Sequence, residues 1–398
     1  MSIYEQLGVE PIINACGSVT RLGGAPMSAE VLEAFHSAAG ETVSLEHLQA
    51  VASSRIATAT RTDAGLVTSG AAGGLTLGAA AILTGHNLAR MEQLPCCDGF
   101  PNEIIIAREQ RSGYDHAVRA TGARLIEVGF NEQVSGAGVR RTEAWEYEAA
   151  MTPQTAAVVY VQSADSRPAL EEVVAVAHSH KLPVLVDAAG ELPPRSNLQD
   201  IPGTGADLVV FSGGKAIRGP QSTGILCGRR ELISAAALQM LDMDDHPELW
   251  DPPEELIESS RVDGIPRHGI GRSLKVSKEE IAALLTALDL FVSGAYDTQL
   301  KDYRRWLTAV ADGLSKTKVA TRLVEPAASD QWPVLEIHID AAAVGKSAFD
   351  ICRELRNGNP AIYVGHAHLQ QGKLLINPVC LTTCLLPELL RRLQNSVS

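Results

Sequence analysis

Residues 209–220 read VVFSGGKAIRGP, an apolar run that ends in Ser-Gly-Gly and then presents a single lysine, Lys215. A second apolar run, residues 182–186, ends in Asp187, 28 positions earlier (215 − 187 = 28). This spacing fits one strand–loop–strand unit. A lysine that can form an imine and a carboxylate that can keep a pyridine nitrogen protonated are the two groups that pyridoxal 5'-phosphate (PLP) chemistry requires. The two runs therefore predict PLP as the cofactor.

Each of these two residues also has a plainer interpretation. Lys215 could be a surface lysine in a glycine-rich loop, and Asp187 could be the N-cap of a helix. The neighbours of Lys215 argue for a cofactor site, because Ser212 and the two glycines that follow it permit close approach, and residues 218–221 (RGPQ) are rigid and polar. A largely desolvated lysine is less basic and more available as a nucleophile.

A small-residue turn lies upstream, at residues 68–74 (TSGAAGG), before an apolar helical run over 75–83. Backbone amides at the start of a helix can bind a phosphate, assisted by the helix dipole and here by the Ser69 hydroxyl. The alternative is a tight turn that only allows close helix packing. Together with Lys215, the turn favours a phosphate site.

A polar segment, residues 108–116 (REQRSGYDH), follows a buried strand predicted over 103–107. It therefore starts at the carboxyl edge of the sheet, where Gln110, Tyr114 or His116 is placed to lie over a pyridine ring or to relay a proton. The alternative is a solvated polar loop.

A basic segment, residues 267–275 (RHGIGRSLK), stands out in an acidic chain. Arg267, His268 and Arg272 could clamp a substrate carboxylate or the cofactor phosphate, within one chain or across a dimer interface. The alternative is a basic surface loop that caps the following helix.

Composition limits the classes of function. The net charge of −13 argues against a nucleic-acid partner, and the seven scattered cysteines contain no C-x-x-C pair, which argues against a zinc site or a disulfide framework. Residues 1–7 lack the features of a signal peptide, and the apolar stretch 71–83 is too short to span a bilayer. We expect a cytoplasmic protein with no membrane association.

The order of apolar runs predicts an α/β fold. Short apolar strands alternate with helices up to about residue 265, which indicates a mainly parallel sheet covered by helices. Beyond that point strands and helices mix as in a smaller α+β domain. We expect the alternating elements to form a large domain over 50–265. The expected strands of the large domain are 103–107, 124–128, 156–162, 182–187, 206–211 and 224–227.

Several segments together resemble a known family. Residues 187–194 (DAAGELPP) and 205–221 (GADLVVFSGGKAIRGPQ) resemble the selenocysteine-synthase-like branch of fold-type I PLP enzymes, and within it the D-glucosaminate-6-phosphate ammonia-lyase-like group. Further similar segments are 14–17 (NACG), 113–119 (GYDHAVR), 122–129 (GARLIEVG) and 271–280 (GRSLKVSKEE).

The resemblance implies a fold-type I PLP-transferase fold with a seven-stranded-type sheet and active sites at a dimer interface. It also implies that the small domain is built from both chain ends, 1–49 and 266–398. It assigns the Schiff base to Lys215, the pyridinium partner to Asp187 and phosphate contacts to Ser69, Gly70 and Ala71. Selenocysteine synthases carry an additional N-terminal tRNA-binding region, which this short acidic N-terminus does not offer, so a tRNA role is not expected.

We therefore expect a homo-oligomeric PLP enzyme acting on a small amino acid or amino-sugar acid. Lys215 is the expected base, Asp187 and His116 the other catalytic residues. The expected reaction is elimination from a 2-amino-3-hydroxy acid to a 2-oxo acid and ammonia. Racemisation, retro-aldol cleavage and, less favoured, a seleniumtransferase-like reaction on aminoacyl-tRNA are the alternatives.

Overall fold

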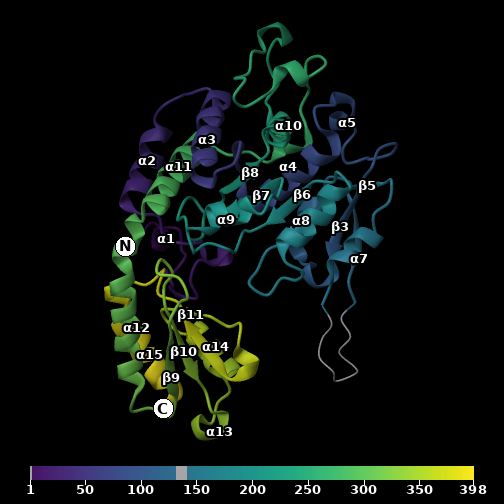
Figure 1. Cartoon of the computed structure of the whole chain (residues 1–398). Helices are drawn as coiled ribbons and strands as arrows, with labels where there is room; N and C mark the ends of the chain where they lie inside the picture. The colour runs from purple at the N-terminus through teal and green to yellow at the C-terminus, as the bar shows by residue number, and fades with distance from the viewer. Residues whose placement is uncertain (1, 131–140) are drawn as a thin grey trace. The chain divides into compact units, whose positions relative to one another are not determined.

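The computed structural model describes residues 2–130 and 141–398. The chain divides into two compact units (Figure 1). The large unit is Met27–Val292, and the small unit combines the chain ends, Met1–Pro26 and Ser293–Ser398. The large unit is longer than the expected 50–265, because segments 27–49 and 266–292 belong to it as well.

Side-chain contacts explain these boundaries. Helix α3 (Leu45–Thr60) runs across the expected boundary at residue 49 and is fixed to strand β2 (Ala64–Thr68). The Gln49 amide donates to the Val67 carbonyl at 2.9 Å and accepts from the Val67 N–H at 3.1 Å. Likewise, Leu284 of helix α11 (Lys278–Ser293) packs on the loop that carries Lys215.

A seven-stranded sheet forms the centre of the large unit, in the order β2-β8-β7-β6-β5-β3-β4. Strand β8 is antiparallel to both of its neighbours and the other pairs are parallel. The expected mainly parallel α/β fold is confirmed. The strands besides β2 are β3 (Glu103–Ala107), β4 (Arg124–Val128), β5 (Thr155–Val161), β6 (Val184–Asp187), β7 (Leu208–Ser212) and β8 (Gly224–Gly228).

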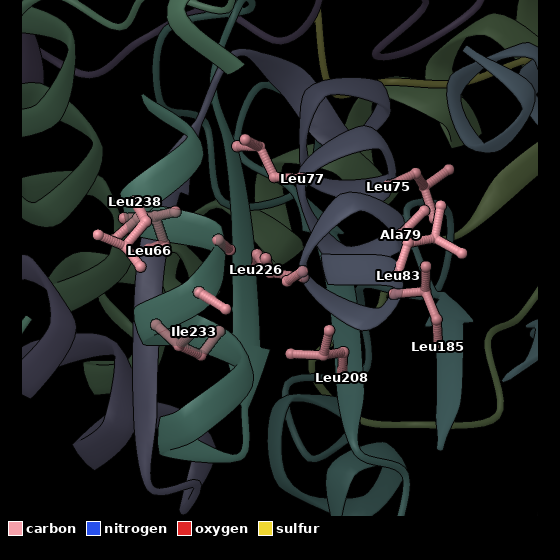
Figure 2. Packing of buried hydrophobic residues seen from close by; sticks show 14 of the residues in the cluster. Leu66, Leu75, Leu77, Ala79, Leu83, Leu185, Leu208, Leu226, Ile233 and Leu238 are labelled. Atoms are coloured by element: carbon pink, nitrogen blue, oxygen red, sulfur yellow. The ribbon is translucent and has the colours of Figure 1, made fainter. Parts of the chain in front are cut away.

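Helix α4 (Gly70–Thr84) contributes many buried residues to the hydrophobic core of the large unit. Its small residues let the helix approach the sheet closely: a Cβ at Gly78 would lie 3.0 Å from the side chain of Leu185. Figure 2 shows leucines of α4 and side chains of helix α10 (Arg230–Met240) facing leucines from neighbouring strands. The labelled leucines on the strands are Leu66, Leu226, Leu208 and Leu185.

The remaining helices of the large unit cover the sheet or lie at its periphery. They are α2 (Ala29–Ala39), α5 (Leu88–Gln93), α6 (His116–Arg119), α7 (Ala144–Ala149), α8 (Leu170–Ser179) and α9 (Asn197–Gly203).

The small unit has two small sheets and its own core. One is antiparallel in the order β12-β10-β9, and the other pairs β1 with β11 in parallel, so the two chain ends are joined by strand pairing. Its strands are β1 (Ile13–Ala15), β9 (Ala320–Val324), β10 (Val334–His338), β11 (Ile362–Val364) and β12 (Lys373–Ile376). Its helices are α1 (Ile3–Gln6), α12 (Leu300–Leu314), α13 (Ala341–Val344), α14 (Ala348–Arg356) and α15 (Leu386–Val397).

Among the described residues, no single helix has both the length and the apolar character to cross a membrane. Two helical segments joined by a bend, Lys278–Ser293 and Ala295–Leu314, are together long and apolar enough to do so, judged by length and composition alone.

Candidate active site

The carboxyl ends of six strands that run in the same direction (β2, β7, β6, β5, β3 and β4) lie at one edge of the large sheet, which is where open α/β folds bind ligands. The start of the antiparallel strand β8 lies at the same edge, with Gly224 in register with Thr68 on one side and Ser212 on the other. The turns after β2 and β7 are therefore held beside each other.

Lys215 follows strand β7 on a tightly closed loop. The Gly213 N–H donates to the Thr223 carbonyl and the Gly219 N–H to the Gly213 carbonyl, both at 2.9 Å. A Cβ at Gly214 would lie 2.4 Å from the Cα of Gln221, so a side chain there would collide with the returning limb of the loop. The glycines thus serve the loop's own packing and hold Lys215 half-buried beside the sheet edge.

Asp187 ends strand β6, in register with Val161 of β5 and Val210 of β7. Its Oδ1 accepts from the Ala189 N–H at 3.0 Å. Burial raises the pKa of the Asp187 carboxyl, while the Ala189 N–H and the charge of Lys215 act to lower it. The next helix, α9, begins only at Asn197, so Asp187 is no helix N-cap.

Glu191 joins this pair, although the sequence alone gave no reason to single it out. Its N–H donates to the Ala188 carbonyl at 3.1 Å and its carbonyl accepts from the Asn197 side chain at 2.6 Å, which fixes the turn. Burial and the charge of Asp187 raise the pKa of Glu191, and Lys215 opposes the rise. No sequence signal identifies Glu191, because its closeness to Asp187 and Lys215 depends on how this turn folds.

The turn after β2 has the features expected of an anion site. Helix α4 is fifteen residues long, and its N-cap, Ser69, makes no side-chain capping hydrogen bond. Gly70 adopts a φ of +71°, which side-chain-bearing residues rarely adopt. Ala71 continues the first turn, where backbone N–H groups and the helix dipole favour a phosphate.

Two amide side chains at the same edge have unpaired atoms. Gln110 accepts from the Val161 N–H at 2.9 Å through Oε1, but its Nε2 is buried with no hydrogen-bond partner among the described residues. The Oε1 of Gln162 is likewise buried without a hydrogen-bond partner among the described residues. A buried polar group without a partner costs about 1–3 kcal/mol, so these atoms fit a site that takes a polar ligand.

Tyr114 and His116 occupy different surroundings. Tyr114 is 68% exposed, and His116 is exposed at the start of α6. Between them, Asp115 is buried and accepts from Arg111 at 2.5 Å and Arg119 at 3.0 Å. Among the described residues, neither Tyr114 nor His116 forms a hydrogen bond or an ion pair with Lys215.

Residues of the basic segment already form ion pairs with acidic residues of the same chain. Arg267 is 81% exposed and lies 3.4 Å from Glu92. The Nε2 of His268 accepts from the Met243 N–H at 2.9 Å, and Arg272 pairs with Asp242. The segment packs on the middle of α4 and the end of α10, since a Cβ at Gly271 would meet Leu77 and Gln239. Within one chain, it is therefore not a free anion clamp at the sheet edge.

Comparison with known proteins accounts for this arrangement. The SelA family, described as L-seryl-tRNA selenium transferase, matches residues 12–243. The chain belongs to the SelA family. The resemblance inferred from the lysine segment is thereby confirmed.

Named relatives of this SelA-family chain span most of its length. It is 31% identical to the 5'-C-glycyluridine monooxygenase-decarboxylase of a Streptomyces species, over 98% of this chain and 91% of the relative. It is 28% identical to the D-glucosaminate-6-phosphate ammonia lyase of Salmonella typhimurium, over 95% and 93%.

A solved structure of D-glucosaminate-6-phosphate ammonia-lyase matches with a TM-score of 0.79 at 27% identity, covering 100% of this chain and 98% of the other. More distant PLP enzymes share only the fold, for example a structure of SPT with PLP at a TM-score of 0.53 and 14% identity. The SelA-family chain is thus a fold-type I, PLP-dependent enzyme. The half-buried lysine, the facing carboxylate, the helix start and the unpaired amide atoms all fit this cofactor.

Proposed function

We propose that this enzyme is a lyase that converts a 2-amino-3-hydroxy acid or an amino-sugar acid into a 2-oxo acid and ammonia. The observation that carries the proposal is the cluster of Lys215, Asp187 and Glu191 at one sheet edge. The ammonia lyase relative, which aligns with 95% of the chain, supports the choice of reaction and the amino-sugar acid as a substrate class.

The cofactor, when bound, withdraws electrons from the α-carbon of an amino substrate and so weakens the bonds at that carbon. In our proposal Lys215 holds the cofactor through Nζ and, once released, takes the α-proton at the same atom. Asp187 keeps the pyridine nitrogen protonated. Ser69, Gly70 and Ala71 bind the phosphate, and Ser212 and Gln110 complete the cofactor contacts.

Glu191 supplies the proton that the leaving group needs. Hydroxide is a poor leaving group, and the burial and neighbouring negative charge that raise the pKa of Glu191 favour its protonated form. The α-proton goes to Lys215, and the β-hydroxyl departs with the Glu191 proton as water. A proton then moves from the amino nitrogen to the β-carbon, and water displaces the amino group as ammonia. The proton on Lys215 returns to Glu191, so both side chains are restored and the water lost and the water added cancel.

We further propose that the remaining site residues act in a homo-oligomer. Arg267, His268 and Arg272 lie away from the sheet edge of their own chain, and they would bind the substrate anion of a neighbouring copy. Tyr114 would bind substrate and His116 would relay a proton once a second copy covers these exposed positions.

The test is product formation by the purified protein with PLP. Ammonia and 2-oxo acid are measured with a panel of 3-hydroxy amino acids and amino-sugar acids, with and without a 6-phosphate. Release of neither product from any member would refute the lyase.

A second candidate rests on the Streptomyces relative, named a monooxygenase-decarboxylase, which is 31% identical over 98% of the chain. A reaction of that kind consumes oxygen and releases carbon dioxide, so an oxygen electrode separates it from elimination. Exchange of the α-proton in deuterated water without net product would select a racemase. Glycine plus an aldehyde would select retro-aldol cleavage.

A further inference from the structure

Two arginines of the small unit lie over one tyrosine ring. The guanidinium carbon of Arg21 is 5.4 Å from the ring centroid of Tyr363, and that of Arg356 is 5.3 Å from it. Arg21 comes from the N-terminal segment, while Arg356 ends helix α14 and Tyr363 lies in strand β11 (Figure 1). Two distant parts of the sequence therefore each place a positive charge against the same tyrosine ring.

The pairing of β1 with β11 creates this juxtaposition. Asn14 is in register with Tyr363, so the residues that follow β1 leave the sheet beside the tyrosine. The Asn14 side chain fixes the turn, donating to the Gly17 carbonyl and accepting from the Cys16 N–H, both at 2.9 Å. Arg21 stands five residues after Cys16, in the 3-10 turn Thr20–Leu22.

Neither arginine is neutralised within the part of the chain that the structure describes. No carboxylate lies within ion-pairing distance of Arg21 or Arg356, and the Nε of Arg356 is buried without a hydrogen-bond acceptor. One turn away on the same helix, Arg353 pairs with Asp350 at 3.0 Å.

Both charges reach the thiol of Cys16. Burial raises the pKa of Cys16, and the charges of Arg21 and Arg356 oppose that rise. The two guanidinium groups therefore act on the same half-buried position.

We propose that Arg21, Arg356 and Tyr363 form a binding site for a small oxyanion, phosphate or carboxylate, beside Cys16. Guanidinium groups present planar, forked donors that match the paired oxygens of both anions, and a tyrosine face holds such planes in a defined orientation. The anion supplies the acceptor that Arg356 Nε lacks. All the residues of this site belong to the small unit, so the inference does not depend on the lyase reaction.

The experiment measures alkylation of Cys16 by iodoacetamide in the full-length holoenzyme, by peptide mass spectrometry. The probes are inorganic phosphate and, separately, acetate, and their relative potency identifies the preferred oxyanion. Saturating anion is expected to slow the reaction at Cys16 about tenfold, since it covers the thiol and cancels the charges that favour the thiolate. The exposed Cys384 should react at an unchanged rate.

Matched variants separate the site from a general salt effect. Arg21→Gln and Arg356→Gln should each raise the anion concentration for half-protection about tenfold, the equivalent of one charge-assisted hydrogen bond. Arg353→Gln, on the same helix, should leave it unchanged. If the glutamine variants fail to fold, Arg21→Lys and Arg356→Lys keep the charge but lose the fork, and should show weaker protection.

The site is refuted if neither anion protects Cys16 in the unmodified protein. It is also refuted if the folded double variant Arg21→Gln/Arg356→Gln is protected at the same anion concentration. Either result would mean that the two arginines are hydrated cations that only stack on the tyrosine ring.

Discussion

Gly224→Ala tests the proposed phosphate site through a single methyl group. A Cβ at residue 224 would lie 2.4 Å from the carbonyl carbon of Gly70 and 2.6 Å from the backbone nitrogen of Ala71. This is about 1 Å short of an ordinary contact, which begins near 3.4 Å. Because both clashing groups are backbone, neither can turn aside, and the start of α4 must move away from β8.

The expected effect follows from hydrogen-bond geometry. A shift of about 1 Å takes a bond of about 2.9 Å beyond the 3.5 Å limit at which it still contributes. Loss of one charge-assisted bond to the phosphate costs about 1.5–3 kcal/mol, which is about a 10- to 100-fold loss of affinity for PLP. Overpacking should also lower the free energy of unfolding of the apoprotein by about 1–3 kcal/mol.

The assay is a titration of apoprotein with PLP, followed by the visible absorption of the bound cofactor, with urea unfolding alongside it. Gly203→Ala is the control, because a Cβ there meets nothing within 4 Å. Unchanged PLP affinity in a folded Gly224→Ala protein would refute the placement of the phosphate at the start of α4. Loss of stability with full affinity would refute it as well.

Three further outcomes test the other roles. Lys215→Ala should abolish the visible absorption band of the bound cofactor and the covalent PLP found after borohydride reduction; a retained covalent adduct would show that another residue anchors PLP. Glu191→Gln should lower kcat for ammonia release about 10²-fold, the usual contribution of a general acid, while PLP binding stays intact; an unchanged kcat would remove Glu191 from the mechanism. If Arg272 serves a neighbouring copy, the Lys215→Ala and Arg272→Gln proteins should each be inactive alone. Mixed and allowed to exchange subunits, they should regain up to about a quarter of wild-type activity. No recovery after proven exchange would place Arg272 outside a shared site.

Several strands of the large sheet were predictable because they are short runs rich in apolar residues. Strands 103–107 and 124–128 occur with the expected bounds, and β6 and β7 lie within two residues of theirs. Strand β1 was not predicted, since its three residues carry no pattern of their own and pair with a strand near the other end of the chain. Helix α3 was missed because its buried face is built from Gln49, Ser53 and small residues rather than from an apolar stripe.

The site was predictable where chemistry and position coincide. Lys215 and Asp187 each follow an apolar strand, and neighbouring parallel strands end at one edge, so their meeting was implied by order along the chain. The role of Glu191 was not, because it depends on how the turn after Asp187 folds back toward Lys215.

The sequence by itself determined the cofactor chemistry, because a lysine and an aspartate at the ends of adjacent strands are local features that survive in any parallel arrangement of those strands. Only the tertiary structure decided which charges remain available. The basic segment 267–275 is rich in cations, yet its Arg272 and His268 already face acids. Arg21 and Arg356 carry no motif, yet strand pairing leaves both beside one tyrosine with no acid among the described residues. Charge is a property of the residue, but neutralisation depends on neighbours that the fold brings within a few ångströms.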